Sequence, residues 1–179
     1  QANESGVNYY VEDGEIIHTQ LIGSPVHFQQ ILMNIGSNAV KYNHDGGSVT
    51  VTCREVSYTD TTAEYELTCT DTGISMSEEF QKRAFEPFAQ EGQLARTKYA
   101  GTGLGLAISR KLIELQGGTL FFESIQGKGT KFILHISFEI SAEEQKKKFH
   151  MYQNCSVEGI QVLLVEDNEL NMEIAEFLL

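Results

Sequence analysis

Apolar and polar positions predict one central amphipathic helix between His27 and Tyr42. Apolar side chains in this stretch recur at about 100° per residue and form a single core-facing stripe, made of Phe28, Ile31, Leu32, Ile35 and Ala39. Asn34, Asn38 and Lys41 recur at i, i+4 and i+7, so they form a polar row along one edge of that stripe. Asparagine works against helix propensity, and its amide oxygen can bind a hard cation, while a lysine can face a phosphate. On the helix alone, this ligand-binding row and a merely solvated row are about equally favoured.

The flanking residues give this helix a start and a stop. Ser24 is an N-cap residue with Pro25 at the first helical position, and the run Asn43-His44-Asp45-Gly46-Gly47 predicts the end of the helix. Gly36 inside the helix costs about 1 kcal/mol against alanine, so we expect close packing against a neighbour there. Two further helices are predicted, a short one at Ser77–Ala84 and a longer one at Leu104–Gln116.

Alternating apolar and polar positions predict three pairs of strands. The pairs are 7–11 with 15–19, 48–57 with 63–70, and 119–124 with 130–139. The first pair flanks the turn Glu12-Asp13-Gly14, so we expect it to form a hairpin.

Composition narrows the classes of protein that the chain can represent. At 179 residues, of which 41% are hydrophobic, it has room for one domain of common size and a remainder. A net charge of −12 argues against a nucleic-acid or anionic-membrane surface. Cys53, Cys69 and Cys155 form no CxxC pair, which favours a reducing compartment over a zinc site or a disulfide framework. No apolar run approaches the roughly 18 residues of a membrane span.

Two short motifs are candidates for ligand binding. Asp71-Thr72-Gly73 follows directly on a predicted strand, where a carboxylate and a glycine suit a ligand that approaches the backbone, although Asp-X-Gly turns are also common in loops. Gly101-Thr102-Gly103-Leu104-Gly105-Leu106 places three glycines at alternate positions before a helix, so that backbone N–H groups can meet phosphate oxygens. A dinucleotide fold needs GxGxxG directly after a strand. Here the spacing is GxGxG after a polar loop, which excludes that alternative.

The stretch 89–100 shows little apolar periodicity and predicts a flexible loop. Its two cations, Arg96 and Lys98, are either solvated or reach a bound anion, and solvation is the default for exposed cations.

The last part of the chain changes character. Residues 142–158 are charged and polar and predict a linker. Ile160–Val165 then predicts a buried strand that ends in Glu166 and Asp167, adjacent carboxylates suited to magnesium.

Four of these stretches together resemble the ATP-binding catalytic domain of sensor histidine kinases, in the superfamily shared with gyrase, chaperone and MutL ATPases. The helix at 27–42, Asp71-Thr72-Gly73, Phe85-Glu86-Pro87-Phe88 and Gly101–Leu106 are similar to the N, G1, F and G2 boxes, in that order. The tail VLLVEDN resembles the start of a response-regulator receiver domain, so the parent would be a hybrid kinase. The resemblance divides the chain into a catalytic domain (1–141), a linker (142–158) and the start of a receiver domain (159–179).

The resemblance implies a fold and roles for single residues. The fold would be a two-layer α/β (α+β) sandwich of the Bergerat type, a mixed, mostly antiparallel sheet covered on one face by helices. Asn38 would ligate Mg²⁺ on the ATP phosphates with help from Asn34, and Asp71 would accept a hydrogen bond from the adenine amine. The other implied nucleotide-binding residues are Lys41, Tyr42, Gly73, Arg96, Lys98, Gly101, Thr102, Gly103, Leu104, Gly105, Leu106 and Thr130, with residues 89–100 as the ATP lid. In the receiver-like tail, Glu166 and Asp167 would form a second Mg²⁺ pair, inactive in so short a segment.

The implied function is to bind ATP·Mg and to supply the γ-phosphoryl group to a histidine on upstream dimerisation helices. Hydrolytic relatives carry glutamate at the position of Asn34, and an amide cannot act as that base, whereas phosphoryl transfer needs chiefly positioning and charge neutralisation. None of the five histidines has the acidic and Arg/Pro context of a phosphoacceptor, so we expect that this chain does not phosphorylate itself. We expect it to be a monomer, because the family's dimerisation helices would lie upstream. Implied partners are those helices, a receiver domain in cis and a response regulator, in the cytoplasm and without direct membrane contact. The alternatives are a nucleotide-binding regulatory module without kinase activity and a serine-kinase anti-sigma factor.

The chain departs from the family pattern at several positions. Ser75 replaces the usual second glycine of the G1 box and adds a side chain near the adenine pocket. Ala100 replaces a glycine before the G2 box, and the order Arg96-Thr97-Lys98 is unusual. Ser24 and His27 replace a common aspartate and arginine. We expect weaker nucleotide binding as a result.

Overall fold

The chain divides into two units, residues 1–146 and 147–179. The computed structural model describes residues 6–91 and 102–144, and all elements named below belong to the first unit. Residues 142–144 form a helical turn in which the Glu144 N–H donates to Ser141 Oγ at 3.3 Å. The rest of the predicted linker and the predicted start of a receiver domain lie outside the described residues.

Six strands form one mixed sheet in the order β1-β3-β4-β6-β2, with β5 also paired to β6. Among the described strands, β1 and β3 are the one parallel pair, and the other pairs are antiparallel. The bounds are β1 Asn8–Asp13, β2 Leu21–Ile22, β3 Ser48–Tyr58, β4 Thr62–Asp71, β5 Thr119–Ile125 and β6 Gly129–Ile140. The second and third predicted strand pairs are therefore confirmed to within one or two residues, as is the mostly antiparallel sheet.

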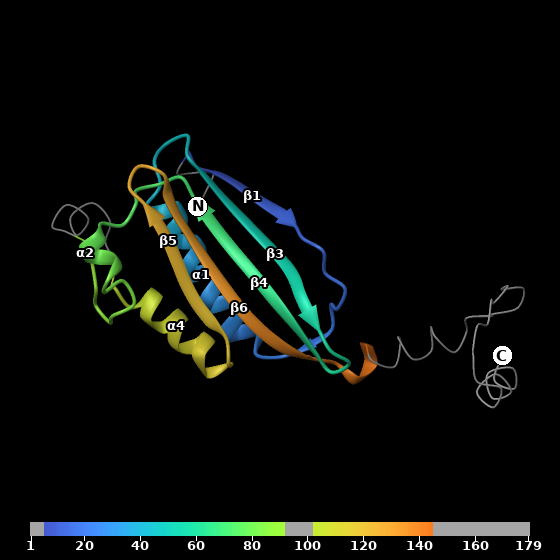
Figure 1. Ribbon diagram of the computed structural model, residues 1–179. Helices are drawn as coiled ribbons and strands as arrows, with labels where there is room; N and C mark the ends of the chain where they lie inside the picture. The colour runs from blue at the N-terminus through green and yellow to red at the C-terminus, as the bar shows by residue number, and fades with distance from the viewer. Residues whose placement is uncertain (1–5, 92–101, 145–179) are drawn as a thin grey trace, which may run out of the picture. The chain divides into compact units, whose positions relative to one another are not determined.

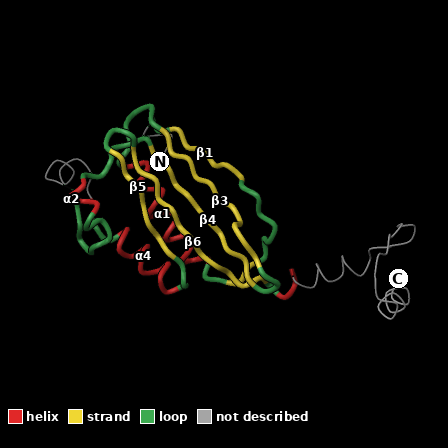
Figure 2. The backbone as a smooth tube through the Cα atoms, in the orientation of Figure 1, coloured by secondary structure: helices red, strands yellow, loops and turns green. Residues whose placement is uncertain are grey.

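The helices cover one face of this sheet (Figures 1 and 2). They are α1 Pro25–Lys41, α2 Glu78–Gln81 and α4 Gly105–Leu115. The predicted stripe of α1 faces inward, because Ile31, Ile35 and Ala39 are buried and Phe28 and Leu32 pack against the same core. The strands contribute alternate residues to this core: Tyr65, Leu67 and Cys69 of β4, and Phe132, Leu134 and Ile136 of β6. The predicted two-layer α/β sandwich is confirmed.

The predicted helix ends are also found. Ser24 Oγ accepts the His27 N–H at 3.4 Å, and Pro25 is the first residue of α1. Ser77 Oγ accepts the Phe80 N–H at 3.2 Å and caps α2. This helix is shorter than predicted, since it ends at Gln81 and the chain continues in turns with bonds between residues three apart. Among the described residues, no helix is both long and apolar enough to cross a membrane.

The predicted hairpin at the start of the chain is wrong. β1 pairs in parallel with β3, and its expected partner at 15–19 is not a strand. The chain continues past β1 along the same neighbour: the Gly14 N–H donates to the Cys53 carbonyl at 3.1 Å and the Glu55 N–H to the Glu15 carbonyl at 2.9 Å. Alternation along a strand specifies its two faces but not its partner, so a distant strand could satisfy the backbone of β1 equally well.

The close packing expected at Gly36 is also not found. A Cβ built on Gly36 would meet only the Tyr9 hydroxyl, at 3.8 Å, which is an ordinary van der Waals distance. The helix therefore carries a glycine where an alanine would fit.

A buried contact between His18 and Glu55 fastens the segment between β1 and β2 to the sheet. His18 is 1% exposed, and its Nδ1 lies 2.6 Å from Glu55 Oε1 on β3. Glu55 Oε2 accepts the N–H groups of Ile17 and His18, and the Tyr65 hydroxyl donates to the His18 carbonyl at 2.6 Å. Burial alone raises the pKa of Glu55, but these hydrogen bonds and the His18 ring lower that pKa below its ordinary value.

The lowered pKa makes this contact sensitive to acid. A carboxylate with a lowered folded-state pKa stabilises the fold above its unfolded pKa, and this contribution is lost as the pH falls through the folded pKa. We expect Glu55→Gln to lower the free energy of unfolding at pH 7 by about 1–3 kcal/mol and to flatten its fall below about pH 4.3. Urea unfolding at several pH values measures both effects. Glu139→Gln, on the exposed surface of β6, is the control, and an equal pH dependence in the two variants would contradict the assignment.

Candidate functional site

The end of α1 and the loop after β4 meet at one end of the sheet. The Ile74 N–H donates to the Tyr42 carbonyl at 2.8 Å, and the Thr72 N–H donates to the Ser48 carbonyl at 3.1 Å. A Cβ on Gly73 would overlap the Tyr42 carbonyl and come within 2.8 Å of the Asn43 Cα, both of them backbone atoms. Glycine is therefore required at 73 for the loop to lie against the end of α1.

Asp71 is the last residue of β4 and is buried beneath this loop, with only 6% of its surface exposed. Its Oδ1 accepts two backbone N–H groups, from Gly73 at 2.9 Å and from Thr130 at 3.2 Å. Burial raises the pKa of Asp71 above its ordinary value, although both of these hydrogen bonds lower it in part. One carboxylate oxygen is thus fixed by the backbone, and the orientation of the other oxygen is fixed with it.

The polar row on α1 divides into two parts. The Asn34 Nδ2 donates to the Gly105 carbonyl at 3.2 Å and to Ser109 Oγ at 3.1 Å, while Asn34 Oδ1 accepts from Gln30 at 3.2 Å. Asn34 therefore joins α1 to the first turn of α4. Within residues 6–91 and 102–144, no hydrogen bond occupies the side-chain amide of the half-buried Asn38.

Lys41 and Tyr42 lie at the end of α1 next to the Asp71 loop. The Lys41 Nζ lies 5.0 Å from the centre of the Tyr42 ring, and both side chains are partly exposed. Their position places a cation and an aromatic ring one helical turn beyond Asn38, at the edge of the region floored by Asp71.

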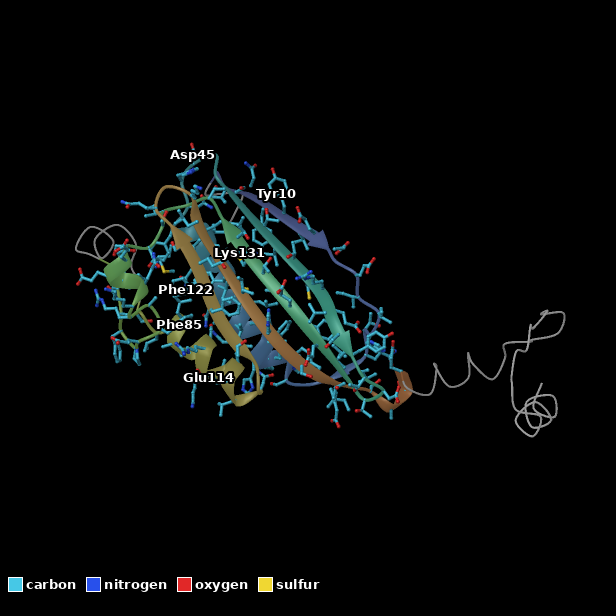
Figure 3. All side chains as sticks on the ribbon, in the orientation of Figure 1. Tyr10, Asp45, Phe85, Glu114, Phe122 and Lys131 are labelled. Atoms are coloured by element: carbon cyan, nitrogen blue, oxygen red, sulfur yellow. The ribbon has the colours of Figure 1, made fainter. Side chains whose placement is uncertain are left out.

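The segment Phe85-Glu86-Pro87-Phe88 contacts both β5 and the glycine-rich stretch before α4. Figure 3 shows Phe85 and Phe122 side by side, and their ring centroids are 5.4 Å apart. The Arg110 guanidinium lies 4.9 Å from the centre of the Phe85 ring. The Phe88 N–H donates to the Gly103 carbonyl at 3.0 Å. Gly103 has φ +69°, and a Cβ there would lie within 2.8 Å of the Phe88 carbonyl carbon. Only glycine meets both conditions without strain.

The start of α4 offers backbone donors. In the part of the chain that the structure describes, no side chain caps this helix, so the N–H groups of its first turn are not used by a capping residue. Thr102 is exposed and its Oγ1 accepts the Leu104 N–H at 3.4 Å, while Leu106 packs against the core. Such an N-terminus, with the positive end of the helix dipole, suits a phosphate.

The predicted site residues are thus brought together in two groups that share α1. Asp71 and Gly73 lie with Lys41, Tyr42 and Thr130, whereas Gly105 lies with Asn34, and Gly103 lies against Phe88. Three predicted nucleotide-binding residues, Arg96, Lys98 and Gly101, and the tail carboxylates Glu166 and Asp167 lie outside the described residues. Sequence reasoning did not include two serines of the site. Ser109, which is fully buried and four residues after Gly105, was detectable as a polar residue on the inner face of a helix; Ser124 on β5 had no such signal.

The chemistry of the donors limits how a metal can bind. Among the described residues, no group of three or more His, Cys, Asp or Glu side chains is arranged to hold a metal ion. An oxygen-preferring cation would therefore be held by one or two protein oxygens, by the ligand's own phosphates and by water, as magnesium usually is with nucleotides. The Asn38 amide oxygen fits that role.

Comparison with known proteins places this arrangement in one family. The profile of the family described as "Histidine kinase-, DNA gyrase B-, and HSP90-like ATPase" matches residues 23–140. Sensor histidine kinase AruS of Pseudomonas aeruginosa is 36% identical over 163 residues, which is 91% of this chain and 16% of that protein. The signal transduction histidine-protein kinase BarA of Escherichia coli is 29% identical over 140 residues, 78% of this chain and 15% of that protein. The chain therefore spans about a sixth of the length of these relatives.

Solved structures of other proteins have the same fold as this chain. Full-length ShkA in complex with AMPPNP is 26% identical and superimposes with a TM-score of 0.62, over 80% of this chain and 28% of that chain. The mycobacterial sensor histidine kinase MprB is 25% identical with a TM-score of 0.59, over 78% of this chain and 87% of that chain.

Proposed function

The chain belongs to the histidine kinase-, DNA gyrase B- and HSP90-like ATPase family, and on this premise we propose that residues 1–141 are the catalytic domain of a histidine kinase. This domain binds ATP with Mg²⁺ and supplies the γ-phosphoryl group to a histidine on dimerisation helices of the same parent protein. The observation that carries the proposal is Asp71, a buried carboxylate whose Oδ1 is held by two backbone N–H groups. Its other oxygen would accept a hydrogen bond from the amino group of adenine.

Each group at the site then has one task. Asp71 orients the base, and Gly73 keeps the loop backbone close to the end of α1, so that the base can enter. The amide oxygen of Asn38 holds the metal, and Lys41 faces the phosphates. Mg²⁺, when bound, neutralises the charge that develops on the transferred phosphoryl group. The first turn of α4 directs its N–H groups to the phosphates.

Asn34 supports transfer to a protein acceptor over hydrolysis. An amide cannot remove a proton from water, and both ends of this one are already engaged, with Gln30 on one side and with Gly105 and Ser109 on the other. Asn34 thus positions α4 relative to α1, while the acceptor histidine comes from another segment.

The remaining parts of the proposal concern the parent protein. We propose that the tail is the start of a receiver domain, that Arg96, Lys98 and Gly101 contribute to the phosphate site from the lid, and that a cytoplasmic response regulator receives the phosphoryl group. The parent would then be a hybrid histidine kinase.

The proposal predicts where phosphate appears. With γ-labelled ATP and Mg²⁺, we expect no label on this chain alone, and label on a longer form of the parent protein that includes the dimerisation helices. His18 is 1% exposed. The surface histidines His27, His44 and His135 lack the combined acidic and Arg/Pro context of a phosphoacceptor, although Asp45 follows His44, so none is expected to accept phosphate. Acid-labile label on this chain alone would contradict the assignment of the acceptor, and no label on the longer form would contradict kinase activity.

A further inference from the structure

The hydroxyl of Ser75 joins the loop that follows Asp71 to the turn between β5 and β6. Its O–H donates to the Ile125 carbonyl at 2.7 Å, and its Oγ accepts the N–H groups of Gly127 at 2.9 Å and Gly129 at 3.4 Å. A hydroxyl offers one donor and two acceptor positions, so the whole hydrogen-bonding capacity of Ser75 is used on this turn.

A second set of contacts links the same two segments and ends on the Asp71 carboxylate. The Met76 N–H donates to Ser124 Oγ at 2.9 Å, and that hydroxyl lies 3.0 Å from Thr130 Oγ1. The backbone N–H of Thr130 is one of the two donors to Asp71 Oδ1. Thr130, the second residue of β6 after the turn, thus supplies one of the two backbone donors to the carboxylate, so a shift of the turn at the start of β6 would reach that donor.

The turn also lies directly on the backbone of the Asp71 loop. Gly129 has φ +97°, and a Cβ there would overlap the Asp71 carbonyl and come within 2.9 Å of the Thr72 Cα. So close a contact between two backbones is kept only if the β5–β6 turn does not move relative to the Asp71 loop. The Ser75 hydroxyl bridges both ends of the turn, from Ile125 to Gly129, and therefore fixes that position.

We propose that Ser75 is a positioning residue for adenine recognition: its hydroxyl holds the β5–β6 turn so that the Thr130 N–H stays on the Asp71 carboxylate. The inference rests on the proposed function and deepens it. The sequence alone predicts that a side chain at position 75 weakens ATP binding. The proposal predicts instead that the Ser75 hydroxyl strengthens it, because the hydroxyl supports Asp71 through the turn.

Ser75 positions the β5–β6 turn and contributes only weakly to the stability of the fold. Ile125 and Gly127 are exposed, so water can replace the hydroxyl at these two groups when it is removed. The bond from the buried Gly129 N–H is the longest of the three, at 3.4 Å, so the net loss of stability is small. The carboxylate, in contrast, is buried and cannot replace a lost N–H donor with bulk water. The effect of the substitution therefore falls on base recognition.

Two ligands separate base recognition from phosphate binding. We compare ATP with inorganic tripolyphosphate, both with Mg²⁺, on the wild-type chain, Ser75→Ala and Ser75→Thr. We expect Ser75→Ala to weaken ATP binding about fivefold, with tripolyphosphate affinity unchanged, and Ser75→Thr to restore most of the ATP affinity. Ser57→Ala is the matched control, since it removes a serine hydroxyl on β3 that donates to the Glu64 carboxylate on β4. ATP affinity unchanged in Ser75→Ala, or lowered equally with that for tripolyphosphate, would overturn the role in base recognition.

A measurement without nucleotide tests the bridge itself. In the ligand-free chain, the amide hydrogens of Gly127 and Gly129 should exchange several-fold faster in Ser75→Ala than in the wild type. Equal exchange rates would overturn the proposal whatever the binding data show. A wild-type chain that binds no ATP would overturn the proposed function and the role of Ser75 together, whereas wild-type binding that Ser75→Ala leaves unchanged would overturn the role of Ser75 alone.

Discussion

Asp71→Asn is expected to weaken ATP binding strongly without destabilising the protein. The substitution keeps the shape of the side chain and an oxygen for the Gly73 and Thr130 N–H groups, but turns an NH₂ group toward the amino group of adenine. Two donors then face each other, and a buried site built for one hydrogen bond discriminates strongly when that bond is missing. We expect a loss in affinity of about 100-fold, or roughly 3 kcal/mol, measured by calorimetric titration of ATP with Mg²⁺.

The stability of the same variant should move in the opposite direction. Burial raises the pKa of Asp71 in the folded chain. A carboxyl group with a raised folded-state pKa stabilises the fold fully below its unfolded pKa, and this contribution is lost as the pH rises through the folded pKa. At pH 7 the ionised side chain therefore costs stability, and a neutral asparagine removes that cost. We expect the free energy of unfolding at pH 7 to be equal to or higher than that of the wild type. A variant that loses binding together with stability would show that Asp71 maintains the fold and would contradict a role in recognising the base.

Asn38→Ala is expected to remove the dependence of ATP binding on Mg²⁺. Within the described residues, no hydrogen bond occupies the Asn38 amide, and its oxygen is the kind of hard ligand that the metal prefers. Without it, ATP affinity in the presence of Mg²⁺ should fall to the level measured with a chelator. Phosphoryl transfer in the longer form of the parent protein should fall about 100-fold or more, since charge neutralisation carries most of that reaction.

A neighbouring substitution controls for effects on the helix. Ser37 precedes Asn38 on α1, is exposed and donates only to the Asn34 carbonyl of its own helix. Ser37→Ala should leave Mg²⁺ dependence intact, and both variants should keep or slightly raise the stability of the wild type, because alanine is the better helix former. Equal Mg²⁺ dependence in Asn38→Ala and Ser37→Ala would rule out Asn38 as the metal ligand.

Those parts of the fold that depend on local pattern could be predicted from the sequence. The stripe on α1, its Ser24 cap and the β3–β4 and β5–β6 pairs follow from periodicity and from turn residues close in the chain. The strand β1 was predicted, but its pairing could not be, because its partner is a parallel strand some 40 residues away and alternation does not identify a partner. The expectation at Gly36 failed for a related reason: a glycine in a helix indicates a cost but not the neighbour that would explain it.

The candidate site was predictable where a residue type is rare in its context, and not where the function of a residue depends on contacts between distant segments. Two asparagines on one helix edge and an aspartate at a strand end are unusual enough to be noticed. That Asn34 bonds Ser109 on α4, 75 residues away, is a property of the tertiary structure alone. Ser75 is the clearest case, since the sequence presents it as a departure that weakens the site, whereas its contacts with the β5–β6 turn indicate support for Asp71.

The most direct test of the central claim is a calorimetric titration of the wild-type chain with ATP and with a non-hydrolysable analogue, each with and without Mg²⁺. A nucleotide site floored by Asp71 and completed by Asn38 predicts saturable binding of both ligands that strengthens with Mg²⁺. No heat of binding up to millimolar nucleotide, from a chain that is folded by circular dichroism, would contradict the claim.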